Sequence, residues 1–266
     1  MPLLDVENLN VTYEARGERT EAVKGLSFSI EAGESVALVG ESGSGKSSAA
    51  LAITKLLPSP PARVSASRVS FIKTDLFNAD EHTLRNVRGG KIAYVFQNPS
   101  GSLNPVLTIG EQIREMIELH TDKRGRQADA VAVEWLKRVG IRDAENRLGS
   151  FPHEFSGGMQ QRAMIAMAMV SSPSLLIADE PTSALDVTVQ VQILKLLKQL
   201  QNDLNLSLLL ISHDLLVVRR MSHRVVVLSK GEAVESGLTE QIFQNPRHPY
   251  TRQLLSARAS MSWGSE

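Results

Sequence analysis

Apolar and polar residues alternate in two segments near the start of the chain, residues 3–14 and 22–30. Alternation with a period of two is typical of half-buried β-strands, so we expect an antiparallel β piece here. Later runs are continuously apolar instead, at residues 35–39, 175–178 and 206–211. Strands that are buried on both faces of a parallel sheet have this second pattern.

Apolar residues at helical spacing separate these strands. The segments expected to form helices are residues 48–57, 108–139, 159–171 and 189–200. Residues 63–77 and 91–96 fit shorter strands, and residues 224–228 with 232–234 fit a hairpin. Strands that alternate with helices predict an α/β fold with a mainly parallel sheet.

Residues 40–47 fit the phosphate-loop pattern Gly-x4-Gly-Lys-Ser. They lie between the buried strand at residues 35–39 and the helix expected from residue 48. Glycines let successive backbone N–H groups turn toward one anion, and a helix N-terminus adds partial positive charge. Lys46 can then reach the outer phosphates, and the Ser47 hydroxyl can ligate Mg²⁺. The motif predicts a nucleoside-triphosphate site formed by Gly40, Glu41, Ser42, Gly43, Ser44, Gly45, Lys46, Ser47 and Ser48.

Two carboxylates, Asp179 and Glu180, directly follow the apolar run at residues 175–178. Nucleotide sites lie at the carboxyl ends of strands in such sheets. An Asp there can hold the Mg²⁺ shell, and a second carboxylate can polarise an attacking water. The simpler alternative is a pair of exposed acids at a strand end, and the phosphate loop makes the functional interpretation the stronger one.

A second potential anion site precedes the helix expected from residue 159. Ser156, Gly157 and Gly158 place a small hydroxyl and two glycines at a helix N-terminus, where backbone N–H groups attract anions. The same residues also cap ordinary helices. One nucleotide needs one phosphate cradle, so a second cradle indicates a second ligand or a site shared across a dimer.

Composition narrows the function classes. The chain has 266 residues with 29 Lys plus Arg and 29 Asp plus Glu, which argues against a nucleic-acid binder driven by bulk charge. It contains no cysteine, so disulfides, thiolate zinc sites and iron–sulfur clusters are excluded. No apolar run approaches the roughly 20 residues of a bilayer span, and acidic residues near the N-terminus argue against a signal peptide.

Together these motifs resemble those of ATP-binding-cassette ATPases. Residues 155–162 resemble the family's signature motif, Gln97 its Q-loop, residues 183–186 its D-loop and His213 its switch histidine. Tyr13 resembles the aromatic residue that stacks on adenine. With the phosphate loop and the two carboxylates, these motifs follow the family's order and spacing over residues 3–235. The signature departs from the usual pattern at Phe155 and Met159, but its serine and both glycines are intact, so we expect an active site.

The resemblance implies a P-loop NTPase (RecA-like) core with an N-terminal antiparallel β subdomain and a helical signature subdomain. It implies a single ATPase domain over residues 1–266. Within this domain, residues 1–97 and 159–236 would form the nucleotide-binding core with its β subdomain. Residues 98–158 would form the helical subdomain, and residues 237–266 a C-terminal helical tail.

The resemblance also assigns roles to single residues in the hydrolysis of ATP. Ser47 and Gln97 would contact Mg²⁺, and Asp179 would hold a metal-bound water. Glu180 would be the general base, and His213 would contact the γ-phosphate. For Tyr13, Gln97, His213 and Asp186 a purely structural role is the simpler alternative.

A head-to-tail dimer is implied as well. Each ATP would lie between Lys46 of one subunit and the segment Ser156, Gly157 and Gly158 of the other, which accounts for the second cradle. Asp186 would communicate across the dimer.

Other stretches resemble the ATPases of dipeptide, oligopeptide and nickel importers, namely residues 57–61, 96–105, 156–162 and 248–251. The short, cysteine-free end of the chain is more similar to nickel or metallophore-type members. This branch implies two transmembrane permease subunits, an extracytoplasmic substrate-binding protein, a second ATPase subunit of the same or a related sequence, and no nucleic acid. The chain would lie peripherally on the cytoplasmic face of the inner membrane.

Two rival functions were considered beside the importer, and the first of them stays open. Accessory ATPases of the carbon–phosphorus lyase complex resemble the same branch but serve a soluble enzyme, and residues 102–105 favour the transporter. A DNA-repair cassette ATPase needs a long coiled-coil insertion, for which this chain has no room. The sequence leaves the transported substrate open, because the ATPase does not touch it.

Overall fold

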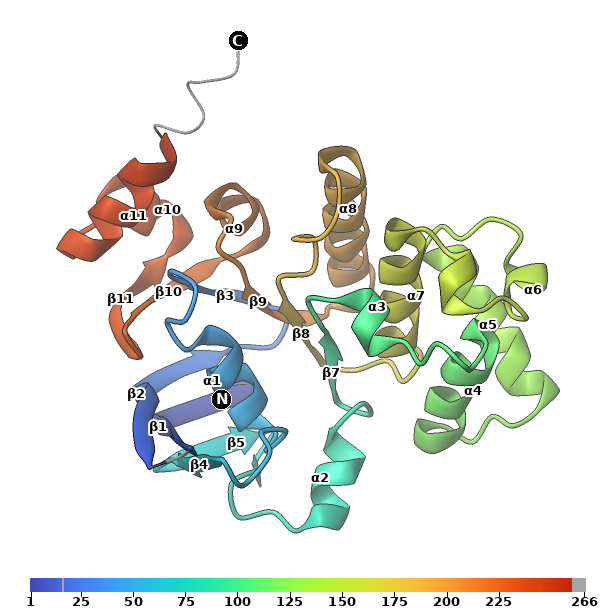
Figure 1. Cartoon of the computed structure of the whole chain (residues 1–266), viewed down its shortest axis with the longest axis horizontal. Helices are drawn as coiled ribbons and strands as arrows, with labels where there is room; N and C mark the ends of the chain where they lie inside the picture. Colours follow the sequence, from blue (N-terminus) through green and yellow to red (C-terminus); the bar gives the residue numbers. More distant parts are fainter. Residues whose placement is uncertain (16, 260–266) are drawn as a thin grey trace. The chain divides into compact units, whose positions relative to one another are not determined.

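The two alternating segments at the N-terminus form a hairpin of strands β1 (Leu4–Ala15) and β2 (Glu18–Ile30). In the computed structural model, which describes residues 1–15 and 17–259, β1 also pairs with β4 (Ala62–Ser65) and β5 (Arg68–Phe71), and β5 pairs with β6 (Thr74–Asp75). All of these pairs are antiparallel. Strands β1, β2, β4 and β5 are labelled together in Figure 1. The prediction of an antiparallel β piece before the phosphate loop is confirmed.

The continuously apolar runs form parallel strands. Strand β3 (Ser35–Val39) lies between β9 (Ser207–Ile211) and β10 (Arg224–Ser229) and is parallel to both. Every residue of β3 and β9 is buried, as expected of strands covered on both faces. Strand β11 (Glu232–Leu238) turns back antiparallel to β10, which confirms the predicted hairpin.

Four helices accompany these strands: α1 (Lys46–Ile53), α9 (Leu215–Met221), α10 (Thr239–Gln244) and α11 (Pro249–Ala259). Helix α1 was predicted to reach residue 57, but it ends at Ile53, and Lys55 turns to a φ of 52°. Proline disfavours helical conformation in the residue before it, and Pro58 follows soon after. Helix α9, of seven residues, was not predicted because so short an apolar stretch shows little periodicity.

A second group of elements lies between residues 85 and 206. Strands β7 (Ile92–Val95) and β8 (Leu175–Asp179) pair in parallel. Helix α7 (Gly157–Met169) contacts β7 and α8 (Val187–Leu204). The predicted strand at residues 91–96 and the predicted helix at 159–171 are confirmed within about two residues at each end.

The helical insertion contains α3 (Pro99–Ser102), α4 (Ile109–His120), α5 (Arg126–Arg138), α6 (Ala144–Arg147) and a 3-10 turn (Pro152–Glu154). Helices α4, α5 and α7 contact one another (Figure 1). The helical character predicted for residues 108–139 is confirmed. The segment forms two helices, because Thr121 leaves the helical conformation and Gly125 adopts a φ of 51°.

The described chain forms two compact units, residues 1–84 with 207–259 and residues 85–206; α2 (Glu81–Val87) contains one boundary. The division into a nucleotide-binding core, a helical subdomain and a tail stays a prediction. No helix within residues 1–15 and 17–259 has the length and hydrophobicity to cross a membrane.

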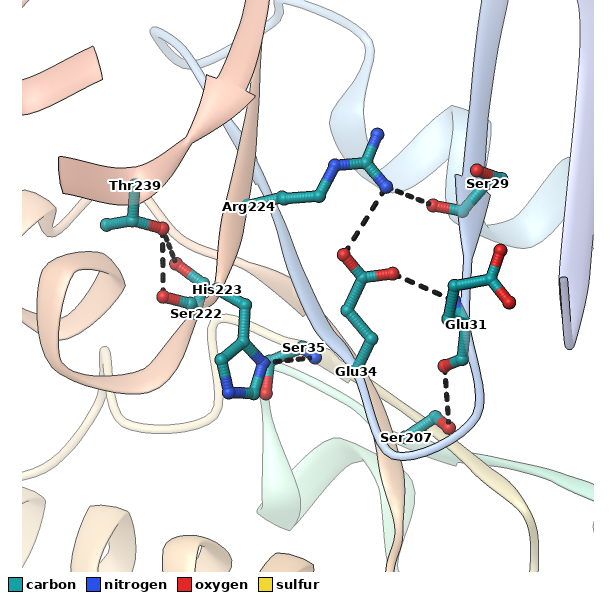
Figure 2. Close-up of polar contacts among 9 residues, drawn as sticks. All are labelled: Ser29, Glu31, Glu34, Ser35, Ser207, Ser222, His223, Arg224 and Thr239. Atoms are coloured by element: carbon teal, nitrogen blue, oxygen red, sulfur yellow. Dashed lines mark hydrogen bonds and ion pairs between the residues drawn. The ribbon is translucent and has the colours of Figure 1, made fainter. Parts of the chain in front are cut away.

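A polar network in the first unit fixes the start of β3 (Figure 2). Glu34, in the turn before β3, accepts hydrogen bonds from the Glu31 N–H at 2.8 Å and from Arg224 Nη1 at 3.3 Å. The Ser35 N–H donates to His223 Nδ1 at 3.0 Å, and Ser207 Oγ donates to the Glu31 carbonyl at 3.3 Å. Side chains from β9 and β10 thus hold the end of β3 opposite the phosphate loop.

Candidate functional site

The predicted phosphate loop leaves the buried strand β3 and enters α1, as the motif requires. Gly45 is the N-cap of α1 with a φ of 100°, and Gly43 has a φ of 79°, values that residues with a Cβ rarely adopt. The Lys46 side chain is buried and curls back into the loop. Its Nζ donates to the carbonyls of Gly40 at 2.9 Å and Glu41 at 2.8 Å, and to Ser44 Oγ at 3.3 Å.

Backbone groups of neighbouring strands press against this loop. A Cβ at Gly45 would overlap the Ala22 carbonyl oxygen of β2, and a Cβ at Gly40 would overlap the Leu228 carbonyl oxygen of β10. The Gly231 N–H, at the tip of the β10–β11 hairpin, donates to the Ser44 carbonyl at 3.2 Å. The loop is therefore held in one shape by its surroundings.

Tyr13 lies beside the start of α1. Its hydroxyl is 3.0 Å from Ser48 Oγ, so the ring of Tyr13 is tied to the residue that follows Ser47. Ser47 itself is exposed at the N-terminus of α1. The structure thus brings together Tyr13, Ser48 and the phosphate loop, which the sequence analysis predicted to bind the nucleotide.

His213 lies two residues after the end of β9, a neighbour of β3 in the same unit. It is exposed, and Asp214 beside it caps α9 by accepting from the Leu216 N–H at 2.9 Å. Strands β3 and β9 are parallel, so His213 and Gly40 follow the same end of the sheet. The predicted contact of His213 with the γ-phosphate stays a prediction.

In the second unit, Gln97 follows β7 and Glu180 follows β8. Gln97 Nε2 donates to Glu180 Oε2 at 2.8 Å, so the two predicted residues meet at the carboxyl ends of these parallel strands. Glu180 has a φ of 45°, a conformation that non-glycine residues seldom adopt and that is frequent at active sites. Asp179 is the last residue of β8.

The donor groups fit Mg²⁺. Magnesium prefers oxygen ligands and is usually held by one or two carboxylates together with substrate phosphates. In the second unit, Asp179 and the amide oxygen of Gln97 are donors of this kind, and the Gln97 amide nitrogen already donates to Glu180. In the first unit, the Ser47 hydroxyl is a donor of this kind. Within the described ranges, no three His, Asp or Glu side chains gather into a cage for a metal.

The signature segment begins α7. Ser156 is the N-cap, and its Oγ accepts from the Met159 N–H at 3.4 Å. Gly157 and Gly158 form the first turn, and a Cβ at Gly158 would come within 2.6 Å of Val189 Cγ1 on α8. Ser156 and Gly157 are exposed. Their N–H groups stand at the N-terminus of a 13-residue helix, as the prediction of a second cradle requires.

Asp186 has a local role in the structure. It is the N-cap of α8, and its Oδ1 accepts from the Val189 N–H at 3.0 Å. This bond explains an aspartate at this position without a partner subunit. The predicted role across a dimer therefore remains a prediction.

One contact of the phosphate loop was not predicted from the sequence. The Glu41 N–H donates to the Tyr250 hydroxyl of α11 at 3.1 Å. A cavity of about 360 Å³ opens beside this contact, between residues 41–44, Lys230 and Gln253. Tyr250 lies in the His-Pro-Tyr-Thr segment at residues 248–251. Its likeness to importer ATPases was the signal in the sequence that this segment has a role, but that likeness predicts no contact with the phosphate loop.

The family is decided by comparison with known proteins. Residues 23–183 match the family model described as "ABC transporter". The chain belongs to the ABC transporter family. Residues 23–183 include the phosphate loop, Gln97, the signature segment and both carboxylates.

Curated relatives belong to the same family. The chain is 49% identical over 258 residues to the "Uncharacterized ABC transporter ATP-binding protein YejF" of Escherichia coli, covering 97% of this chain and 49% of that protein. It is 46% identical over 264 residues to the "Oligopeptide transport ATP-binding protein OppD" of Bacillus subtilis, covering 99% and 74%. The chain thus spans about half the length of the first relative.

A solved structure confirms the fold class. The ATP-binding cassette MJ0796, in a dimeric post-hydrolysis state bound to ADP and Pi, is 29% identical, with a TM-score of 0.79 over 89% of this chain and 98% of that one. The predicted P-loop NTPase fold, α/β with an antiparallel β part and a helical part, is confirmed.

Replacing Gly45 with alanine tests how tightly the loop is held. The new Cβ meets the Ala22 carbonyl as well as an unfavourable φ, so Gly45→Ala should lower the free energy of unfolding by about 2–4 kcal/mol. Gly43→Ala is the matched control, because its φ is also positive but no atom lies within 4 Å of its Cβ. Its cost should be about 1–2 kcal/mol. Equal losses for both variants in denaturant unfolding would show that the loop is not confined at Gly45.

Proposed function

We propose that this chain is the ATP-hydrolysing subunit of an importer that carries peptides across the cytoplasmic membrane. The observation that carries the proposal is a phosphate loop preformed around the buried Lys46. Its ammonium group lies within 2.8–2.9 Å of two loop carbonyls, so a cation already stands where phosphates would enter. The N–H groups of residues 40–47 and the N-terminus of α1 add further positive potential.

Hydrolysis of ATP follows from the residues at the strand ends. Glu180 takes a proton from water as the water oxygen attacks the γ-phosphorus, while the bond from that phosphorus to the bridging oxygen breaks and ADP leaves. The Gln97 amide holds the Glu180 carboxylate in place through their hydrogen bond. His213 and Lys46 bind the γ-phosphate.

Ser47, Gln97 and Asp179 would hold Mg²⁺, which neutralises charge on the phosphates when it is bound. Tyr13 stacks on the adenine, and its hydrogen bond to Ser48 at 3.0 Å keeps the ring in one orientation. Ser48 thereby connects the adenine end of the site to the phosphate end.

We further propose that the complete site needs two subunits. Ser156, Gly157 and Gly158 form an exposed helix N-terminus that would close over the ATP held by the other subunit, with Asp186 nearby. The dimeric, ADP- and phosphate-bound state of the solved relative supports this arrangement. ATP binding would favour the closed dimer, and hydrolysis would release it, a shift of population by differential binding.

The relatives guide the choice of partners and substrate. OppD is named for oligopeptide transport, so peptides are the proposed cargo, with two permease subunits, an extracytoplasmic binding protein and a place on the cytoplasmic face of the membrane. Neither relative reported above is named for nickel or metal chelates. The alternative of an accessory ATPase of a carbon–phosphorus lyase complex has no support from these relatives.

The general base is tested by Glu180→Gln. The amide cannot accept the proton from water, so ATP turnover should fall about 100-fold or more, while equilibrium binding of ATP is retained. Glu134→Gln, on the exposed face of α5, removes the same charge outside the site and should turn over normally. Turnover near that of the wild type in Glu180→Gln would refute the assignment.

The shared site is tested by mixing two inactive variants. Lys46→Ala damages the phosphate loop, and Ser156→Arg fills the cradle for the partner's nucleotide. In a mixed dimer one site combines an intact loop with an intact cradle, so the mixture should regain about a quarter of wild-type activity by random pairing. Mixing Lys46→Ala with itself is the control. A mixture that stays inactive, although the wild type alone hydrolyses ATP, contradicts the shared site.

A further inference from the structure

The His-Pro-Tyr-Thr segment at residues 248–251 has no part in the mechanism above, yet it reaches the phosphate loop. The Tyr250 hydroxyl accepts a hydrogen bond from the Glu41 N–H at 3.1 Å. Tyr250 and Glu41 are 209 positions apart in the sequence and belong to the same compact unit. The contact joins helix α11 to the first turn of the loop.

Both backbone polar groups of Glu41, its carbonyl and its N–H, form hydrogen bonds to side chains. The Glu41 carbonyl accepts from Lys46 Nζ at 2.8 Å, and the Glu41 N–H donates to Tyr250. The far side of the loop is held by the Gly231 N–H, which donates to the Ser44 carbonyl at 3.2 Å. Gly40, the residue before Glu41, lies against the Leu228 carbonyl of β10, and the Glu41 side chain is exposed. The Tyr250 hydroxyl adds a side-chain hydrogen bond to this turn from outside the loop.

The turn that carries Tyr250 is itself firmly anchored. Glu235 of β11 accepts hydrogen bonds from the N–H groups of Arg247 at 2.8 Å and His248 at 3.0 Å. Arg252 Nε donates to the Pro246 carbonyl at 3.0 Å. The Tyr250 N–H donates to His248 Nδ1 at 3.2 Å. The hydroxyl that meets the loop thus projects from a fixed support.

The charge of Glu235 contributes to this support. Burial raises the pKa of Glu235, but the neighbouring Thr251 side chain and the hydrogen bonds from the N–H groups of Arg247 and His248 outweigh it, so the pKa lies below its ordinary value. Hydrogen bonds to the ionised form have this effect. Glu235 is therefore ionised at neutral pH and holds the turn through its carboxylate.

We propose that Tyr250 is a positioning residue for nucleotide binding: its hydroxyl holds the Glu41 peptide so that the phosphate loop keeps its binding shape before ATP arrives. The proposal rests on the proposed function of the loop. A site that is ordered in advance loses less conformational entropy on binding. Removing the hydroxyl should weaken ATP binding and leave the chemical step, which Tyr250 does not touch, unchanged.

The test is Tyr250→Phe, which removes the hydroxyl and keeps the ring. The Kd for ATP in equilibrium titration should rise about two- to tenfold, the range expected for one hydrogen bond, while kcat at saturating ATP stays the same. Hydrogen exchange at the Glu41 amide should become faster in the nucleotide-free protein. Gln253→Ala changes α11 beside the same cavity without removing the bond, so its Kd should match that of the wild type.

A second variant tests whether Glu235 acts on ATP binding by supporting the turn that carries Tyr250. Glu235→Gln keeps the size of the side chain but weakens the support of Tyr250, so the Kd should again rise. The double variant with Tyr250→Phe should bind ATP as weakly as Tyr250→Phe alone, because both changes remove the same restraint. Fully multiplicative effects would show that Glu235 acts independently of Tyr250.

The outcomes separate this inference from the proposed function. A wild-type chain that binds no ATP overturns the proposed function. A wild type that binds ATP, with Kd and Glu41 exchange unchanged in Tyr250→Phe, overturns only the positioning role. A fall in kcat with unchanged Kd would overturn it too.

Discussion

Backbone carbonyl groups from two strands crowd the phosphate loop, and this steric constraint decides which residues the loop contains. The Ala22 carbonyl of β2 leaves no room for a Cβ at Gly45, and the Leu228 carbonyl of β10 leaves none at Gly40. The loop is accordingly closed around the ammonium group of Lys46, which donates to two loop carbonyls. When the cation and the N–H groups of a binding site are already oriented, the free-energy cost of reorganising the site on triphosphate binding is small. The polar network at the other end of β3 fixes the strand that carries this loop.

The catalytic chemistry is divided between two compact units. The first contains Lys46, the phosphate loop and Tyr13; the second contains Glu180, the proposed general base, Asp179, a proposed magnesium ligand, and the exposed helix N-terminus at Ser156. In each unit the functional groups follow the carboxyl ends of parallel strands or begin a helix, the places where side chains and unpaired N–H groups can reach a ligand. The hydrogen bond between Gln97 and Glu180 shows how such a position couples two segments 83 residues apart.

Much of the fold could be predicted because its strands are either alternating or continuously apolar, and both patterns are read directly from periodicity. The break between α4 and α5 was not predicted, because the charged residues 122–124 suit the exposed face of a helix, whereas the φ of 51° at Gly125 does not suit a helix. The residues proposed for the site were predicted from motifs whose chemistry is local. The N-capping bond of Asp186 and the contact of Tyr250 with Glu41 could not be found in this way. The first depends on backbone geometry, and the second joins residues far apart in the chain.

The central claim is that the loop around Lys46 is an ATP site that exists before the nucleotide binds. Equilibrium titration of the wild type and of Lys46→Ala with Mg-ATP tests it most directly. The wild type should bind one Mg-ATP per phosphate loop with a single Kd. The variant should bind about 10- to 100-fold more weakly, the loss expected for hydrogen bonds to a charged group. No binding by the wild type, or equal binding by both proteins, would contradict the account.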